Sequence, residues 1–133
     1  MQAVRIILLN DNHLLSAALQ ARVEQDERFE IVGVARDPNE AARLVDEQHP
    51  DVVLIEAGAG NGSSLEATRL IAHSEAAPRV LIVADPENDL DAVEAHDAGA
   101  TAFLQRPRSA ADLLDTLELA AVLAQARIEP DDG

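Results

Sequence analysis

Residues 50–56 of the chain read PDVVLIE: four aliphatic residues in a row, entered through Pro50-Asp51 and followed by Glu56. A short and continuously apolar run of this kind is typical of a strand buried on both faces of a parallel sheet. Similar runs occur at four other places in the chain, namely Val4–Leu9, Ile31–Ala35, Val80–Ala84 and Ala102–Leu104. Together with Val52–Ile55, these runs predict a sheet of parallel strands.

The longer segments between these runs have the spacing of amphipathic helices. Leu15, Leu19 and Val23 recur at four-residue steps. One apolar helical face is also predicted by Leu113, Leu114, Leu117, Ala120 and Ala121. The expected helix starts and stops are Asp37-Pro38, Asp85-Pro86, the capping-box spacings Ser63–Glu66 and Ser109–Asp112, and Gly99 at the end of the fourth helix.

Strands and helices therefore alternate along the chain as five strand–helix units. Because such crossovers are right-handed, the units predict an α/β, flavodoxin-like fold, a doubly wound five-stranded parallel sheet with helices on both faces. Residues 4–123 are expected to form this single domain. Residues 124–133 are expected to be an acidic tail or the start of a linker. The functional groove of this fold lies at the carboxyl ends of the strands.

Composition narrows the classes of function. The chain has no cysteine, which excludes disulfides, thiolate nucleophiles and cysteine-based zinc sites. Its net charge is −15, and all ten basic residues are arginines without a clustered run, so direct nucleic-acid binding is not expected. No stretch reaches the ~20 apolar residues of a membrane span, and no signal-peptide pattern begins the chain. We expect a cytoplasmic protein.

The residues that follow the expected strands are the candidates for chemistry. They are Asn10-Asp11-Asn12, Glu56 with the loop 57–62, Ala84-Asp85, and Gln105-Arg106-Pro107. Gly58-Ala59-Gly60 suggests a dinucleotide loop, but Ser63 replaces the third glycine and the loop follows the third strand instead of the first. The four histidines have no metal-ligand spacing.

In this order and register, the chain resembles the receiver domains of bacterial two-component response regulators over residues 4–123. The resemblance rests on the acidic turn after the first strand, the stretch 50–56, Leu65-Glu66, Ala98-Gly99-Ala100, Phe103 and Arg106-Pro107. It implies a phosphoryl-accepting aspartate after the third strand and two acids holding magnesium after the first. It also implies a hydroxyl after the fourth strand, and an aromatic residue and a Lys-Pro pair at the fifth.

This sequence departs from that pattern at most of those positions. The acidic pair is Asn10 and Asp11, and the acceptor position holds Glu56. Ala84 stands at the hydroxyl position and Arg106 at the lysine position, whereas Phe103 and Pro107 are retained. Glutamate carries its carboxylate one methylene further from the backbone than aspartate does, and misplacement by about 1 Å can cost about 100-fold in rate.

The resulting hypothesis is an atypical, stand-alone receiver that is not an enzyme and acts through phosphorylation-independent protein–protein interaction. Its partner would bind the face formed by residues 85–121, which could also form a homodimer. A second hypothesis pairs Glu56 with Arg106 as a permanent imitation of the phosphorylated state. No cofactor is expected. If magnesium binds at all, its ligands are expected to be Asp11, Glu56 and the carbonyl of Gly58.

Two alternatives remain open. The chain could be a receiver that still binds magnesium and is phosphorylated at a non-standard acceptor. It could also be a small-ligand-binding flavodoxin-like domain that uses the loop 58–62. Labelling by a phosphodonor would indicate the first, and a nucleotide or flavin retained on purification would indicate the second.

Overall fold

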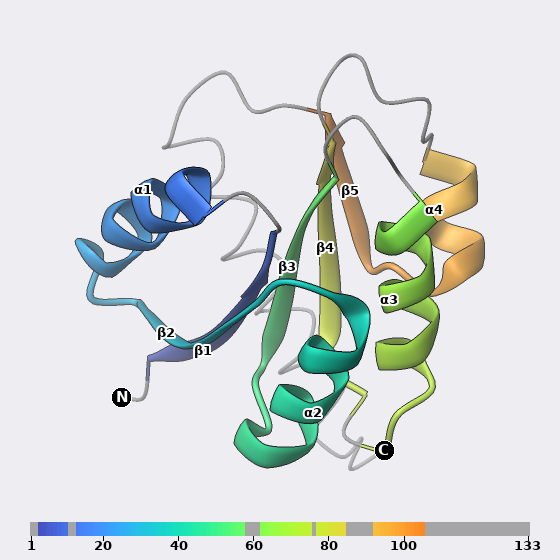
Figure 1. The fold of residues 1–133 in the computed structure, drawn as a ribbon, viewed down its shortest axis with the longest axis horizontal. Helices are drawn as coiled ribbons and strands as arrows, with labels where there is room; N and C mark the ends of the chain where they lie inside the picture. The colour runs from blue at the N-terminus through green and yellow to red at the C-terminus, as the bar shows by residue number, and fades with distance from the viewer. Residues whose placement is uncertain (1–2, 11–12, 58–61, 76, 85–91, 106–133) are drawn as a thin grey trace, which may run out of the picture.

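The computed structural model describes residues 3–10, 13–57, 62–75, 77–84 and 92–105. In these residues a central parallel sheet has helices on both sides (Figure 1). The elements are β1 (Val4–Leu9), α1 (His13–Glu24), β2 (Phe29–Ala35), α2 (Pro38–Gln48), β3 (Val52–Ala57), α3 (Gly62–Ala72), β4 (Arg79–Ala84), α4 (Ala92–Ala98) and β5 (Ala102–Gln105). The predicted α/β, flavodoxin-like architecture is confirmed.

The strand order is β2-β1-β3-β4-β5, and every neighbouring pair is parallel. Successive side chains of a strand point to opposite faces, so the sheet feeds two separate apolar layers. Ile7, Val53 and Ile82 face the layer shared with α2, α3 and α4, whereas Leu8, Leu54 and Leu81 face the layer that includes Val23 of α1. The core is thus almost entirely aliphatic, as the composition predicts.

Four of the five strands extend beyond their apolar runs, β4 and β5 by one residue each, at Arg79 and Gln105. β2 begins at Phe29, which is buried, and continues through the exposed Glu30 before the run at Ile31. β3 continues past Ile55 through Glu56 to Ala57. The third strand therefore ends two residues later than predicted, and the prediction that Glu56 follows it is wrong. Glu56 is part of β3, and its side chain lies on the same face as those of Val52 and Leu54.

The helix-end predictions have mixed outcomes. The side chain of Asp37 accepts a hydrogen bond from the backbone N–H of Glu40, which confirms the cap before Pro38. Gly99 follows α4 with φ of 114°, as a helix stop requires. Ser63, in contrast, lies inside the first turn of α3, because that helix begins at Gly62. The signals at 85–86 and 109–112 and the helix expected at 113–121 lie outside the described residues.

Candidate functional site

The carboxyl ends of β1 and β3 bring Asn10 and Glu56 together. Leu9 pairs with Ile55 in the parallel ladder, so Asn10 and Glu56 are the next residues of two adjacent strands. They have the same side-chain direction, and the amide nitrogen Nδ2 of Asn10 lies 2.6 Å from Oε1 of Glu56. The structure thus brings two of the predicted site residues, Asn10 and Glu56, into direct contact.

The surroundings of Asn10 hold its side chain in place. Its backbone N–H donates to the carbonyl of Ala35 at the end of β2, with an N–O distance of 3.0 Å, and only 8% of the residue is exposed. Because a carboxylate only accepts hydrogen bonds, the atom facing Glu56 must be the amide nitrogen and not the amide oxygen. The pair therefore combines a neutral donor with a partly exposed carboxylate.

Ala84 and Phe103 lie on the other face of the sheet. Ala84 ends β4 opposite Ala57 and is completely buried. Phe103 is partly buried and packs against the same apolar cluster as Ala84, on the side of α3 and α4. Ala57 and Ala84 thus make a small, apolar end to β3 and β4, beside the polar pair of Asn10 and Glu56.

Several predicted site residues lie outside the described residues: Asp11, Gly58, Arg106 and Pro107. The predicted pairing of Glu56 with Arg106 therefore stays a prediction, as does the magnesium ligand set of Asp11, Glu56 and Gly58. Of the predicted 85–121 face, the structure describes α4 and β5 with the turn between them. The sequence did signal Asn10, but as a lost charge and not as a donor to Glu56.

The family resemblance implies a magnesium ion at this site. Among the described residues, no group of three or more His, Asp or Glu side chains is placed to hold a metal ion. Magnesium requires oxygen ligands in near-octahedral geometry, and the amide group that faces Glu56 presents N–H donors instead. Among its described residues, the site thus offers one carboxylate, that of Glu56, beside an amide that donates to it.

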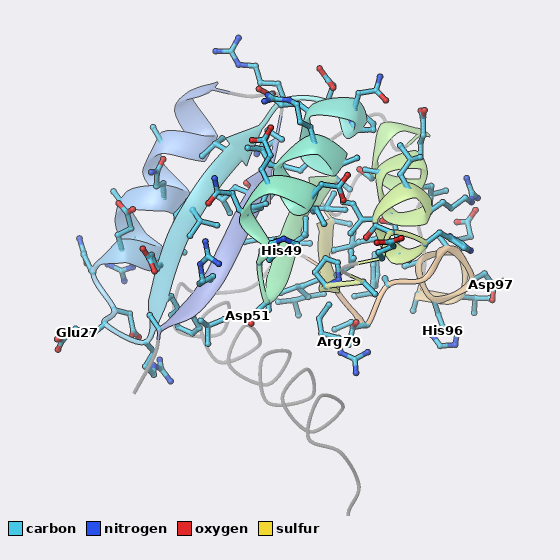
Figure 2. The ribbon with its side chains drawn as sticks, turned by 90° about the horizontal axis from the view of Figure 1, so that it is seen from below. Glu27, His49, Asp51, Arg79, His96 and Asp97 are labelled. Atoms are coloured by element: carbon cyan, nitrogen blue, oxygen red, sulfur yellow. The ribbon has the colours of Figure 1, made fainter. Side chains whose placement is uncertain are left out.

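The opposite edge of the sheet, at the amino ends of the strands, has a structural role. Figure 2 views this edge, with His49, Asp51 and Arg79 labelled. Asp51 accepts from the backbone N–H of Arg5 through Oδ2, and its own N–H donates to the Arg5 carbonyl, both at 2.9 Å. The N–H of Arg79 donates to the carbonyl of Asp51 at 3.1 Å. Asp51 therefore ties β1, β3 and β4 together where they begin.

The arrangement of strands and site is that of a known family. The family model for the response regulator receiver domain matches residues 6–118. The chain is 35% identical over 116 residues to the transcriptional regulatory protein PdtaR of Mycobacterium tuberculosis, a match that covers 87% of the chain and 56% of PdtaR. It is 27% identical over 118 residues to the transcriptional regulatory protein LiaR of Bacillus subtilis, covering 89% of the chain and 56% of LiaR.

A solved structure gives the same assignment. The crystal structure of a two-component response regulator of the LuxR family from Aurantimonas sp. SI85-9A1 superposes with a TM-score of 0.81 at 26% identity, covering 96% of the chain and all of that structure. This chain belongs to the response regulator receiver domain family, and it is a receiver domain of two-component signalling. It spans about half the length of the curated relatives named above. In the described part of the chain, no helix is long and apolar enough to cross a membrane.

Proposed function

We propose that this receiver domain controls another protein by binding it, and that phosphorylation does not switch it. The observation that carries the proposal is the 2.6 Å hydrogen bond from the Asn10 amide to the Glu56 carboxylate. At the position that the resemblance assigns to the phosphoryl acceptor, the carboxylate is longer than an aspartate and already has a fixed donor.

Charge and placement both disfavour phosphoryl transfer to Glu56. Phosphoryl transfer to a side chain depends on in-line positioning and on cations that neutralise the charge developing on the phosphoryl oxygens. A neutral amide beside Glu56 contributes no charge to hold such a cation. The hydrogen bond from Asn10 also draws electron density from Oε1 of Glu56, which makes that oxygen a weaker nucleophile toward phosphorus.

A phosphorylation switch also requires that the phosphoryl group be sensed by another residue, which transmits the change to the rest of the domain. The resemblance assigns this role to a hydroxyl after the fourth strand, where this chain has the fully buried Ala84. A methyl group cannot hydrogen-bond to a phosphoryl oxygen. Phe103, which packs near Ala84, therefore has no polar neighbour at that position through which it could sense phosphate.

Binding through the 85–121 face is supported by the surface of α4. Val93 is 68% exposed, and together with the exposed Glu94 and Asp97 of the same helix it belongs to the surface that a partner would meet. The net charge of −15 favours a partner whose contact surface is basic, because complementary charges speed association and suppress wrong partners.

A spectral titration tests the proposal. The ¹H–¹⁵N resonances of Glu56, Ala84 and Phe103 are followed as magnesium is added, first alone and then with beryllofluoride as a mimic of an acyl phosphate. We expect no specific shifts at these three residues. Shifts that spread from Glu56 to Phe103 would show a working phosphate switch, and the proposal would be abandoned.

A matched variant shows that the titration can detect a response. It carries Asn10→Asp, Glu56→Asp and Ala84→Ser, which return the acids and the hydroxyl that the resemblance assigns to these positions. We expect this variant to shift with magnesium and beryllofluoride while the unmodified chain does not. If neither protein responds, phosphate labelling from a small-molecule donor, measured by intact mass, decides whether the unmodified chain takes phosphate.

A further inference from the structure

The nature of the Asn10 side chain decides which species can occupy the end of β1 and β3. Its Nδ2 group faces Oε1 of Glu56 at 2.6 Å. An amide nitrogen has no available lone pair, so it cannot be a ligand to a cation in this orientation. Asn10, which lies beside Glu56 at the end of the adjacent strand, thus turns a hydrogen-bond donor toward the carboxylate.

Reorienting the amide is unfavourable. A turn that presented the amide oxygen would place it against a carboxylate oxygen, where two acceptors repel each other and a charge-assisted hydrogen bond is lost. The backbone bond to the carbonyl of Ala35 fixes the position of Asn10, and with 8% exposure water offers little replacement for the lost contact.

We infer that Asn10 keeps divalent cations from this site: its amide donates to one oxygen of the Glu56 carboxylate and brings no second charge that would hold a cation there. The inference deepens the proposed function and rests on it, since it names the group that makes the site insensitive to magnesium. The N–H donor of Asn10 stabilises the Glu56 carboxylate, as a cation would stabilise a pair of carboxylates. It does so whether or not magnesium is present.

The test is a single isosteric substitution. Asn10→Asp keeps the size of the side chain and replaces the donor with a second carboxylate beside Glu56. Two carboxylates at hydrogen-bonding distance repel each other, and a divalent cation between them removes that repulsion. We expect the variant to unfold at a lower temperature than the unmodified chain without magnesium.

Magnesium or calcium should then raise the melting temperature of this variant by about 4 °C at a concentration about tenfold above the dissociation constant. The unmodified chain should show no such rise. Asn39→Asp is the control, because it makes the same chemical change on the exposed surface of α2. It should respond to either cation no more than the unmodified chain does.

A double variant separates charge from hydrogen bonding. Asn10→Asp combined with Glu56→Gln restores one donor and one carboxylate with their places exchanged, and the cation response should disappear again. If Asn10→Asp folds but shows no cation-dependent rise, the inference about Asn10 is wrong while the proposed function stands. If the unmodified chain itself binds magnesium at Glu56, as followed by its own resonances, both fail.

Discussion

Gly99→Ala should be strongly destabilising, for two reasons that can be measured separately. Gly99 has φ of 114°, a backbone conformation that side-chain-bearing residues rarely adopt. A Cβ atom added to Gly99 would also lie 2.5 Å from the Cβ of Ala72, the last residue of α3. This contact is between atoms with no freedom to rotate away, so the turn between α4 and β5 or the end of α3 must move.

The magnitude follows from these two terms. A positive φ costs an L-residue about 1–2 kcal/mol, and forcing an extra carbon into a packed contact typically costs about 1–3 kcal/mol. The smaller conformational entropy of the unfolded alanine chain returns about 0.4–1 kcal/mol. We expect a loss of about 3 kcal/mol in the free energy of unfolding, or a fall of about 12 °C in melting temperature for a domain of this size.

Urea unfolding followed by circular dichroism measures this loss. Gly33→Ala is the matched control: Gly33 has no positive φ, and the nearest atom to its added Cβ would be the end of the flexible Leu44 side chain at 3.1 Å. It should not lower the free energy of unfolding by more than about 0.5 kcal/mol, because Leu44 can adjust by a small rotation and the smaller entropy of the unfolded alanine chain offsets the remaining contact.

A double-mutant cycle with Ala72→Gly isolates the steric term. Removing the Cβ of Ala72 abolishes the 2.5 Å contact but leaves the backbone penalty at Gly99. Gly99→Ala should therefore lower the free energy of unfolding about half as much in the Ala72→Gly background as in the unmodified chain. A loss below about 1 kcal/mol for Gly99→Ala, or strictly additive effects in the cycle, would refute this reasoning.

Two further predictions concern other parts of the domain. Hydrogen bonds from the side chain and then the backbone N–H of Arg28 lower the pKa of Asp26 from 3.8 to about 2. The stability that this carboxylate contributes is therefore present above pH 3.8 and is lost as the pH falls through about 2. A carboxyl titration by NMR should find that low pKa, and Arg28→Ala should return it toward its ordinary value; an unchanged pKa in the variant would contradict the assignment. His49 ends α2 with φ of 49°, and His49→Gly should raise the free energy of unfolding by about 0.5–1 kcal/mol, measured in urea, because glycine adopts this conformation without steric cost. Lower stability in this variant would show that the imidazole makes a contact worth more than the backbone relief.

The interior strands could be predicted from sequence because they are buried on both faces. Val52–Ile55 and Val80–Ala84 need no alternation to be recognised, since each residue of the run contributes to one of the two apolar layers. The ends of strands were predicted less well. Glu30 interrupts the apolar pattern after the buried Phe29, and the charge of Glu56 suggested a loop where β3 in fact continues.

The site could be predicted in its members but not in their contacts. Asn10 and Glu56 are both candidates because each follows a predicted apolar run, and the carboxyl ends of all parallel strands lie at one edge of the sheet. Which candidates touch depends on the register between strands, and periodicity along one strand carries no information on register. The pairing of Leu9 with Ile55 sets Asn10 beside Glu56. An equal offset of one residue past two adjacent apolar runs was the available signal for this contact.

The two departures at Asn10 and Glu56 are better understood together than separately. Adjacent parallel strands lie ~4.8 Å apart, and the side chains of neighbouring residues must cover that gap to bond. Asn10 alone would be a missing carboxylate, and Glu56 alone would be an overlong acceptor. As a pair, the longer side chain of glutamate and the amide of Asn10 form a 2.6 Å hydrogen bond at an edge of the sheet where Asn10 is nearly buried. The hydrogen bond joins the ends of β1 and β3 without an external ligand, as the proposed function would require.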